Sequence, residues 1–105
     1  MSDSVHVKPQ RQKSAPQQFN QFIANNNFHV LDYGGYMMQK NQKITFILEG
    51  SSPDNFNCVS VSSPDSMSHI TVRSVGVLGS KYCVTVENGP NISCEIFINL
   101  LVINQ

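Results

Sequence analysis

The chain of 105 residues contains no tryptophan, only two alanines and few charged residues. Alanine is the strongest helix former, whereas valine and isoleucine, which together number 19 here, favour strands. The composition therefore argues against a helical bundle and for a single β-rich domain. Charged residues make up 13% of the chain and cancel to a formal net charge of zero, which argues against a general attraction to nucleic acid or to an anionic membrane.

Segments that direct a chain to a membrane are also missing. No apolar run approaches the ~20 residues of a transmembrane helix, and the first 20 residues lack the apolar core of a secretory signal. The cysteines number three, and an odd count without an export signal favours reduced thiols in a cytosolic setting. We therefore expect intracellular synthesis and no membrane partner.

Residues able to carry chemistry are present, but their spacing forms no recognised site. Cys58, His69, Cys83 and Cys94 include the ligand types of zinc, yet zinc signatures bring ligands in close pairs on a turn, and no such pair occurs here. The chain has no Gly-x-Ser-x-Gly motif, no phosphate-binding glycine loop and no dinucleotide fingerprint. We predict a non-enzymatic protein with no catalytic residue, metal, cofactor or small-molecule substrate.

The first 27 residues differ in composition from the rest. After the initiator, the apolar residues up to Gln18 are Val5, Val7 and Ala15, and the segment cannot bury enough surface to offset the entropy of ordering it. We predict a flexible N-terminal arm over residues 1–27. Within it, apolar residues at helical spacing mark the short segment 19–24, which either plugs one end of the core or docks on a partner. These residues are Phe19, Phe22 and Ile23.

From residue 28 to residue 105 the pattern predicts an antiparallel β-sandwich. Short alternating runs are separated by turn residues every 8–12 residues, which is typical of a sandwich or a barrel. The pair Gly34-Gly35 predicts a hairpin between strands 28–33 and 36–40. A Ser-Ser-Pro-Asp turn occurs twice, and the alternation after it predicts which side chains face the core. This predicted inward set is Val59, Val61, Ile70, Val72, Val84 and Val86.

Two regions of this body are candidate contact surfaces. Tyr33 and Tyr36 flank the predicted hairpin and precede Met37, so the three either pack across its stem or form an exposed recognition tip. The last strand is apolar on both faces, and a face of this kind must be covered by a second layer or by another chain. Its outer set is Phe97, Leu101 and Ile103, which we expect another subunit or the segment 19–24 to cover.

The stretch from Lys43 to Ile103 resembles a small immunoglobulin-like β-sandwich in its Ser-Pro-Asp turns, Val-x-Val strands and long final strand. It lacks the Cys…Trp…Cys core of antibody domains. With the arm, its layout is similar to that of minor structural proteins of viruses and phages, of the capsid decoration and cement type.

This resemblance implies a structural or protein-interaction module, carried on a virion, that self-associates or joins lattice neighbours through its last strand and arm. The alternative is a small soluble phage-type inhibitor that binds and blocks a host defence complex. A nucleic-acid partner is not expected, because Arg73 is nearly alone among the strand residues that could serve such a surface. The predicted interface residues are Phe19, Phe22, Ile23, Tyr33, Tyr36, Met37, Phe97, Leu101 and Ile103.

Overall fold

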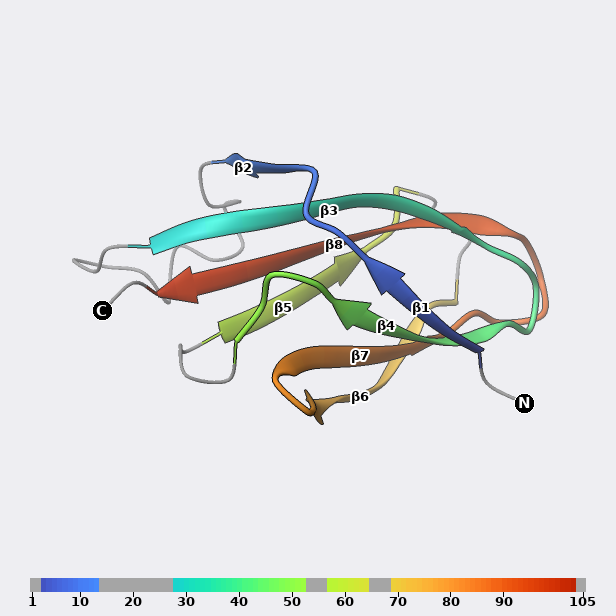
Figure 1. Ribbon diagram of the computed structural model, residues 1–105. Coiled ribbons are helices and arrows are strands. Elements are labelled where there is room, and N and C mark those ends of the chain that lie inside the picture. The colour runs from blue at the N-terminus through green and yellow to red at the C-terminus, as the bar shows by residue number, and fades with distance from the viewer. Residues whose placement is uncertain (1–2, 14–27, 53–56, 65–68, 104–105) are drawn as a thin grey trace.

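The computed structural model describes residues 3–13, 28–52, 57–64 and 69–103. Within these ranges the chain forms two four-stranded sheets, ordered β1-β4-β7-β6 and β2-β3-β8-β5. Figure 1 shows them as two layers, and the all-β sandwich predicted from the sequence is confirmed. The strands are β1 (Asp3–Val7), β2 (Arg11–Lys13), β3 (Phe28–Met38), β4 (Lys43–Leu48), β5 (Asn57–Ser62), β6 (Thr71–Leu78), β7 (Lys81–Glu87) and β8 (Cys94–Ile103).

One hydrophobic core lies between the two sheets. Alternate residues of β4 and β7 point into it from the first sheet, and alternate residues of β3 and β8 point into it from the second. Phe46 is its largest fully buried side chain, and burying an apolar side chain stabilises the fold by about 1.5–3 kcal/mol. The core residues are Leu31, Tyr33, Met38, Ile44, Phe46, Leu48, Val84, Val86, Cys94, Ile96, Ile98, Leu100 and Val102.

The inward set predicted from the sequence is reproduced except at one position. Val84 and Val86 are fully buried, and Val59, Val61 and Ile70 are partly buried against the core. Val72 is 44% exposed, so the prediction that it is buried in the core is wrong. The cause is that strand β6, which carries Val72, lies beyond the cover of the second sheet.

Strand β3 runs unbroken from Phe28 to Met38, so the hairpin predicted at Gly34-Gly35 is wrong. The register along β8 shifts between Asp32 and Gly35, and the Gly34 amide donates to Asp32 Oδ1 at 2.9 Å. Gly34 has a φ of 76°, a left-handed conformation that suits glycine. The glycines form a β-bulge, because the runs on either side of them both pair with β8 and not with each other.

The N-terminal segment contributes one strand to each sheet. Strand β1 pairs in parallel with β4, and β2 pairs antiparallel with β3. Between them, the Gln10 amide donates to Asp32 O at 2.7 Å. Val5 and Val7 pack against the core, so two alternating valines and a paired backbone hold residues that the composition assigned to a flexible arm. The sandwich is therefore mixed and not antiparallel throughout, and the segment 19–24 lies outside the described residues.

Strand β8 is central in the second sheet, between β3 and β5. On its outer face Leu101 lies opposite Val30 of β3, and both are fully buried within the single chain. Phe97 on the same face is partly buried, whereas the side chain of Ile103 lies outside the described part. Atoms of the same chain thus cover the outer face at Leu101.

A turn after β7 joins several segments at one end of the sandwich. The side-chain amide Nδ2 of the buried Asn88 donates to Ile92 O at 2.8 Å and Gln39 O at 3.0 Å, with Met38 O at 3.4 Å. The Asn88 backbone amide donates to Gln42 O at 2.9 Å. One buried side chain therefore satisfies carbonyl groups from both the β3–β4 and the β7–β8 connections.

Replacing Asn88 with alanine is expected to lower the free energy of unfolding by about 3 kcal/mol, because buried carbonyl groups lose their donor. Urea denaturation measures this loss. The exposed Asn91 is the matched control, and its replacement by alanine should change stability by less than about 0.5 kcal/mol. Equal effects of the two substitutions would contradict the role of Asn88.

Replacing Leu101 with aspartate is expected to destabilise the isolated chain by at least about 3 kcal/mol, because it places a charge at a fully buried position. Denaturation of the chain at low concentration checks this. Asn91→Asp, an exposed control, should leave stability nearly unchanged. Wild-type stability of the Leu101 variant would show that this position faces solvent.

Candidate interaction edge

Strand β6 forms one edge of the first sheet and lies at the bottom of Figure 1. It pairs antiparallel with β7 on one side, and its other side faces no described strand. The tight connection through Gly79, which has a φ of 64°, and Ser80 sets Leu78 opposite Lys81. Every residue from Thr71 to Leu78 is exposed. No other strand whose side chains are all described is exposed along its whole length.

A bulge at Arg73 determines which β6 side chains share a face. The register against β7 shifts between Val72 and Ser74, so three valines of β6 fall opposite Val86, Val84 and Tyr82. Opposing residues of an antiparallel pair share a face, and these partners point toward the core. The three valines, Val72, Val75 and Val77, therefore also lie on the inner face.

The inner face of β6 extends beyond the cover that the second sheet provides. Val84 and Val86 of β7 are fully buried, whereas Val75 and Val77 directly beside this row are 52% and 53% exposed. Leu78, on the opposite face, is 60% exposed. Val72 has the orientation predicted from the sequence but lacks the predicted burial, because no core side chain reaches across β6.

Exposed apolar side chains are concentrated on this edge. Within the described ranges the exposed large hydrophobic residues are Met37 of β3 and four residues of β6, namely Val72, Val75, Val77 and Leu78. Natural sheets usually protect an edge with charges, proline or a covering segment. The other edge of the same sheet, β1, carries the polar residues Asp3 and His6. At β5, an edge strand of the second sheet, the valines pack against the core.

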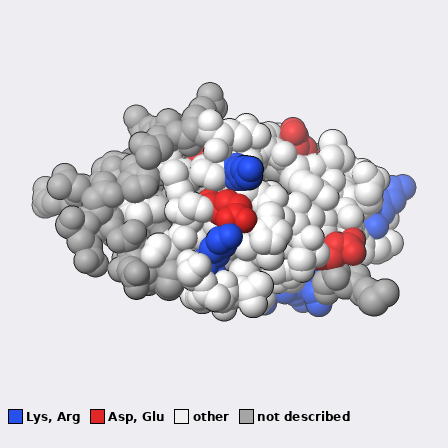
Figure 2. Space-filling view, viewed as in Figure 1, with Lys and Arg blue, Asp and Glu red and all other residues white. Residues whose placement is uncertain are grey.

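Charge is sparse on the face of the molecule shown in Figure 2, where one acidic group lies between two basic groups near the centre and the other charged side chains are scattered toward the rim. On β6 the one charged residue, Arg73, is paired: its Nε and Nη2 atoms lie 2.7 and 2.6 Å from Glu87 Oε1. The segment from Ser74 to Ser80 contains no charged residue. The apolar part of the edge therefore presents no charge of its own to a partner.

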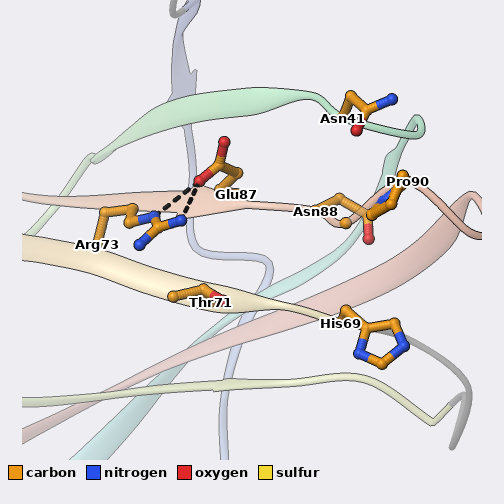
Figure 3. Close-up of a pocket in the computed structure, with 8 residues that line it drawn as sticks. Asn41, His69, Thr71, Arg73, Glu87, Asn88 and Pro90 are labelled. Carbon is orange, nitrogen blue, oxygen red and sulfur yellow. Dashed lines mark hydrogen bonds and ion pairs between the residues drawn. The ribbon is translucent and has the colours of Figure 1, made fainter.

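A polar pocket of about 290 Å³ adjoins the start of β6 (Figure 3). Thr71 and Arg73 line it from β6, Glu87 lines it from β7, and His69 and the turn at Asn88 close it. The His69 ring lies apart from the Arg73–Glu87 pair in Figure 3. The lining of the pocket is polar and offers hydrogen-bonding groups to a partner.

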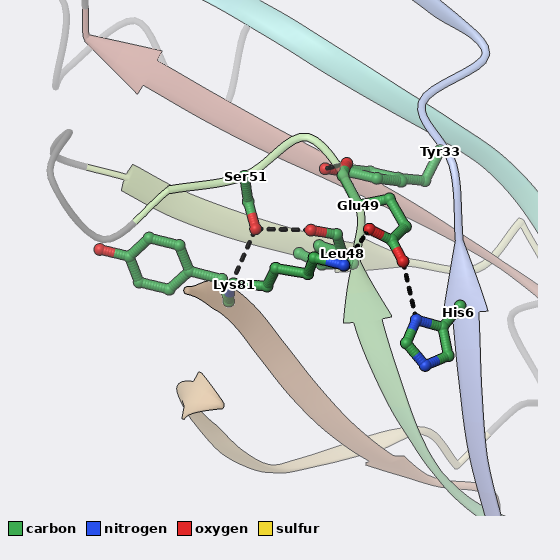
Figure 4. A network of polar contacts seen from close by, with 7 residues as sticks. His6, Tyr33, Leu48, Glu49, Ser51 and Lys81 are labelled. Carbon is green, nitrogen blue, oxygen red and sulfur yellow. Dashed lines mark hydrogen bonds and ion pairs between the residues drawn. The ribbon is translucent and has the colours of Figure 1, made fainter. Parts of the chain in front are cut away.

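A second polar cluster centres on Glu49 at the other end of β7 (Figure 4). The Glu49 carboxylate lies 2.5 Å from Lys81 Nζ and 2.8 Å from His6 Nδ1, so it links β1 to the start of β7. The hydrogen bond from Lys81, followed by that from His6, holds the pKa of Glu49 below its ordinary value. The Tyr33 hydroxyl donates to the Glu49 carbonyl at 2.8 Å, and burial raises the pKa of Tyr33.

Ser51 completes the connection after β4. Its hydroxyl donates to Leu48 O at 2.5 Å and accepts the Tyr82 amide at 2.8 Å. This buried hydroxyl and the Glu49 carboxylate hold the turn against the first residues of β7. The cluster therefore fixes the position of β7, the one described strand to which β6 is attached.

Among the residues that the structure describes, the predicted interface residues do not lie on one surface. Tyr33 is buried in the core, and Tyr36 packs edge-on against Phe46 with ring centroids 5.1 Å apart. Met37 is 53% exposed, but the two tyrosines pack into the core and do not form an exposed tip with it. Phe97 is partly buried and Leu101 fully buried. Phe19, Phe22 and Ile23, together with the Ile103 side chain, lie outside the described part.

Cys83 and Cys94 lie on opposite faces of their sheets. Cys94 is buried on the inner face, where its Sγ lies 3.7 Å from Asn88 Oδ1. Cys83 lies on the outer face of β7 and is partly exposed, and burial raises the pKa of its thiol. Both are free thiols, whereas the side chain of Cys58 lies outside the described part.

Comparison of the chain with protein-family models, curated proteins and solved structures finds no match. Among the residues that the structure describes, there is no helix with the length and apolar character needed to cross a membrane.

Replacing Glu49 with glutamine is expected to lower the melting temperature at pH 7, because it removes the carboxylate that holds His6 and Lys81. The Glu49 pKa is lowered in the folded chain from its ordinary value of 4.5, so the carboxylate stabilises the fold above about pH 4.5. This stabilisation is lost as the pH falls through the folded pKa. Melting temperatures of wild type and variant should therefore converge in acid.

Glu95→Gln is the matched control, since Glu95 is an exposed glutamate of β8. Its melting temperature should follow that of the wild type at every pH. A Glu49→Gln variant with the same pH profile as the wild type would contradict the role of the carboxylate.

Proposed function

We propose that this protein is a non-enzymatic interaction module that binds an extended segment of a protein partner along β6. The observation that carries the proposal is the concentration of exposed apolar residues on one uncovered edge strand. An edge of this kind offers a partner two things at once: a row of backbone hydrogen-bonding groups and an apolar surface beside it.

The geometry defines the partner segment that would fit. An added strand continues the sheet, and its alternate side chains fall beside Val72, Val75 and Val77 on the inner face. Apolar, β-branched residues at every second position suit these neighbours. Covering a half-exposed valine contributes roughly 1 kcal/mol, and each backbone hydrogen bond adds about 0.5–1.5 kcal/mol. Binding thus depends on the length of the added strand.

Two biological settings are compatible with this function. A capsid-associated structural protein would use the edge to join neighbours, and an inhibitor of a host defence complex would use it to bind one foreign chain. Both settings remain predictions from the layout of the sequence. The immunoglobulin-like topology also stays a prediction, and the parallel β1–β4 pair is the feature against which any proposed strand order must be compared.

Random ten-residue peptides displayed on phage and selected against the immobilised protein should yield sequences with β-branched residues at alternate positions. Val77→Lys should weaken the binding of these peptides at least about tenfold, because it places a charge beside the added strand. Met37→Lys is the matched control, since Met37 has the same exposed fraction, 53%, on another strand. Undiminished binding to the Val77 variant would contradict the proposal.

A further inference from the structure

We propose that the strand that binds β6 is β6 of a second copy of this chain, paired antiparallel about Gly76. The sheet β1-β4-β7-β6 of one copy then joins the same sheet of the other copy, and the two form one continuous sheet across a twofold axis. This inference rests on the proposed function and adds the identity of the partner.

The sequence of β6 after its bulge is complementary to itself in one register. Val75 and Val77 lie on the inner face, and Ser74, Gly76 and Leu78 lie on the outer face. With Gly76 opposite Gly76, Val75 of one copy meets Val77 of the other, and Ser74 meets Leu78. All five residues then pair with residues of the same face, as an antiparallel pair requires.

Neighbouring registers are less favourable. If the twofold axis passed between two residues, each inner-face side chain would lie opposite an outer-face side chain, which the pleat of a regular strand does not allow. A centre at Val75 brings the bulged Arg73 opposite Val77, and a centre at Val77 brings Val75 opposite Gly79 of the turn. The centre at Gly76 uses the longest regular stretch and keeps Arg73 outside it.

Nothing within its own chain requires a glycine at position 76. Its φ is not among the positive ones, and an added Cβ would meet no atom within 4 Å. Glycine inside a strand costs roughly 0.5–1 kcal/mol relative to alanine, and it often marks a place where another backbone approaches. On the twofold axis, the two glycines leave the outer side of the junction free of side chains.

Charge and area are consistent with a weak pair. The segment Ser74–Ser80 is uncharged and the chain has a formal net charge of zero, so two copies approach without like-charge repulsion. The five residues that pair in this register, Ser74–Leu78, span about 17 Å in a single sheet layer. The contact is therefore smaller than the about 1,000 Å² in total at which specific interfaces begin, so we expect a weak, concentration-dependent dimer.

Sedimentation velocity of the full chain tests the partner. Wild type should pass from monomer to dimer with a dissociation constant of about 10–500 µM. Val77→Lys should raise this constant at least about tenfold, and Met37→Lys should leave it unchanged. A wild type that stays monomeric up to about 1 mM, or a Val77 variant that dimerises like the wild type, would overturn the inference.

Disulfide trapping tests the register. In a background with Cys58, Cys83 and Cys94 replaced by alanine, Gly76→Cys should form a crosslinked dimer under mild oxidation. Opposing Cα atoms lie about 4.5–5.5 Å apart, within disulfide range. Ser74→Cys is the control, because its two copies would lie about 13 Å apart across the axis. Equal crosslinking of Ser74→Cys would overturn the register.

If the background lacking the three cysteines does not fold, the same variants are made in the wild type. The crosslinked peptides are then identified by mass spectrometry, where a 76–76 linkage supports the register and a dominant linkage elsewhere contradicts it.

Failure of the inference is distinguishable from failure of the proposed function. If selected peptides bind along β6 but the chain stays monomeric, the second copy is not the partner and the proposed function stands. If the peptides do not bind and dimers form independently of Val77, both are wrong.

Discussion

The turn at Asn88 and Gly89 is the constraint on which the arrangement of strands depends. The Asn88 side chain holds carbonyl groups of the β3–β4 and β7–β8 connections, and the Gly89 carbonyl accepts the Asn41 amide at 3.0 Å. The Gly89 amide donates to His69 O at 3.0 Å, just before β6 begins. A Cβ on Gly89 would lie 2.8 Å from that of His69, so glycine permits this close approach. One turn thus anchors three connections.

This anchoring explains why β6 is held in place and yet remains open. Its beginning is fixed by the turn, its end by the tight connection to β7, and its length by pairing with β7. At the other end of the molecule, Glu49 and Ser51 fix the start of β7 in turn. The core side chains end at β7, so the valines of β6 have an ordered position without a covering layer. A rigid, uncovered apolar edge is suited to binding, because its backbone needs no reordering when a partner strand arrives.

Sequence patterns were sufficient for the β-sandwich and for the burial of five of the six predicted inward side chains, because strict alternation in segments such as Val84–Val86 reports burial directly. They were misleading where a bulge replaced a turn. Gly34-Gly35 has the signature of a hairpin, but only the position of β8 shows that both flanking runs share one partner. Val5 and Val7 were too few to predict strand β1, whose pairing with β4 is a long-range contact.

The exposure of the candidate edge β6 could also not be predicted from local sequence. The spacing of three between Val72 and Val75 breaks the alternation and is a signal for the bulge at Arg73, yet exposure depends on how far the opposite sheet extends. No property of β6 alone determines that extent, so its exposure could not be read from the strand itself. The predicted contact residues Tyr33 and Leu101 are buried, which likewise depends on the rest of the fold and not on their own strands.

The most direct test of the account is amide hydrogen exchange measured by NMR across β6 and β7 as a function of protein concentration. In dilute solution, alternate amides of Ser74–Leu78, those that point away from β7, should exchange rapidly while the amides of β7 are protected. These same β6 amides should become protected as the concentration rises. Protection of every β6 amide in dilute solution would show that the edge is already covered and would contradict the account.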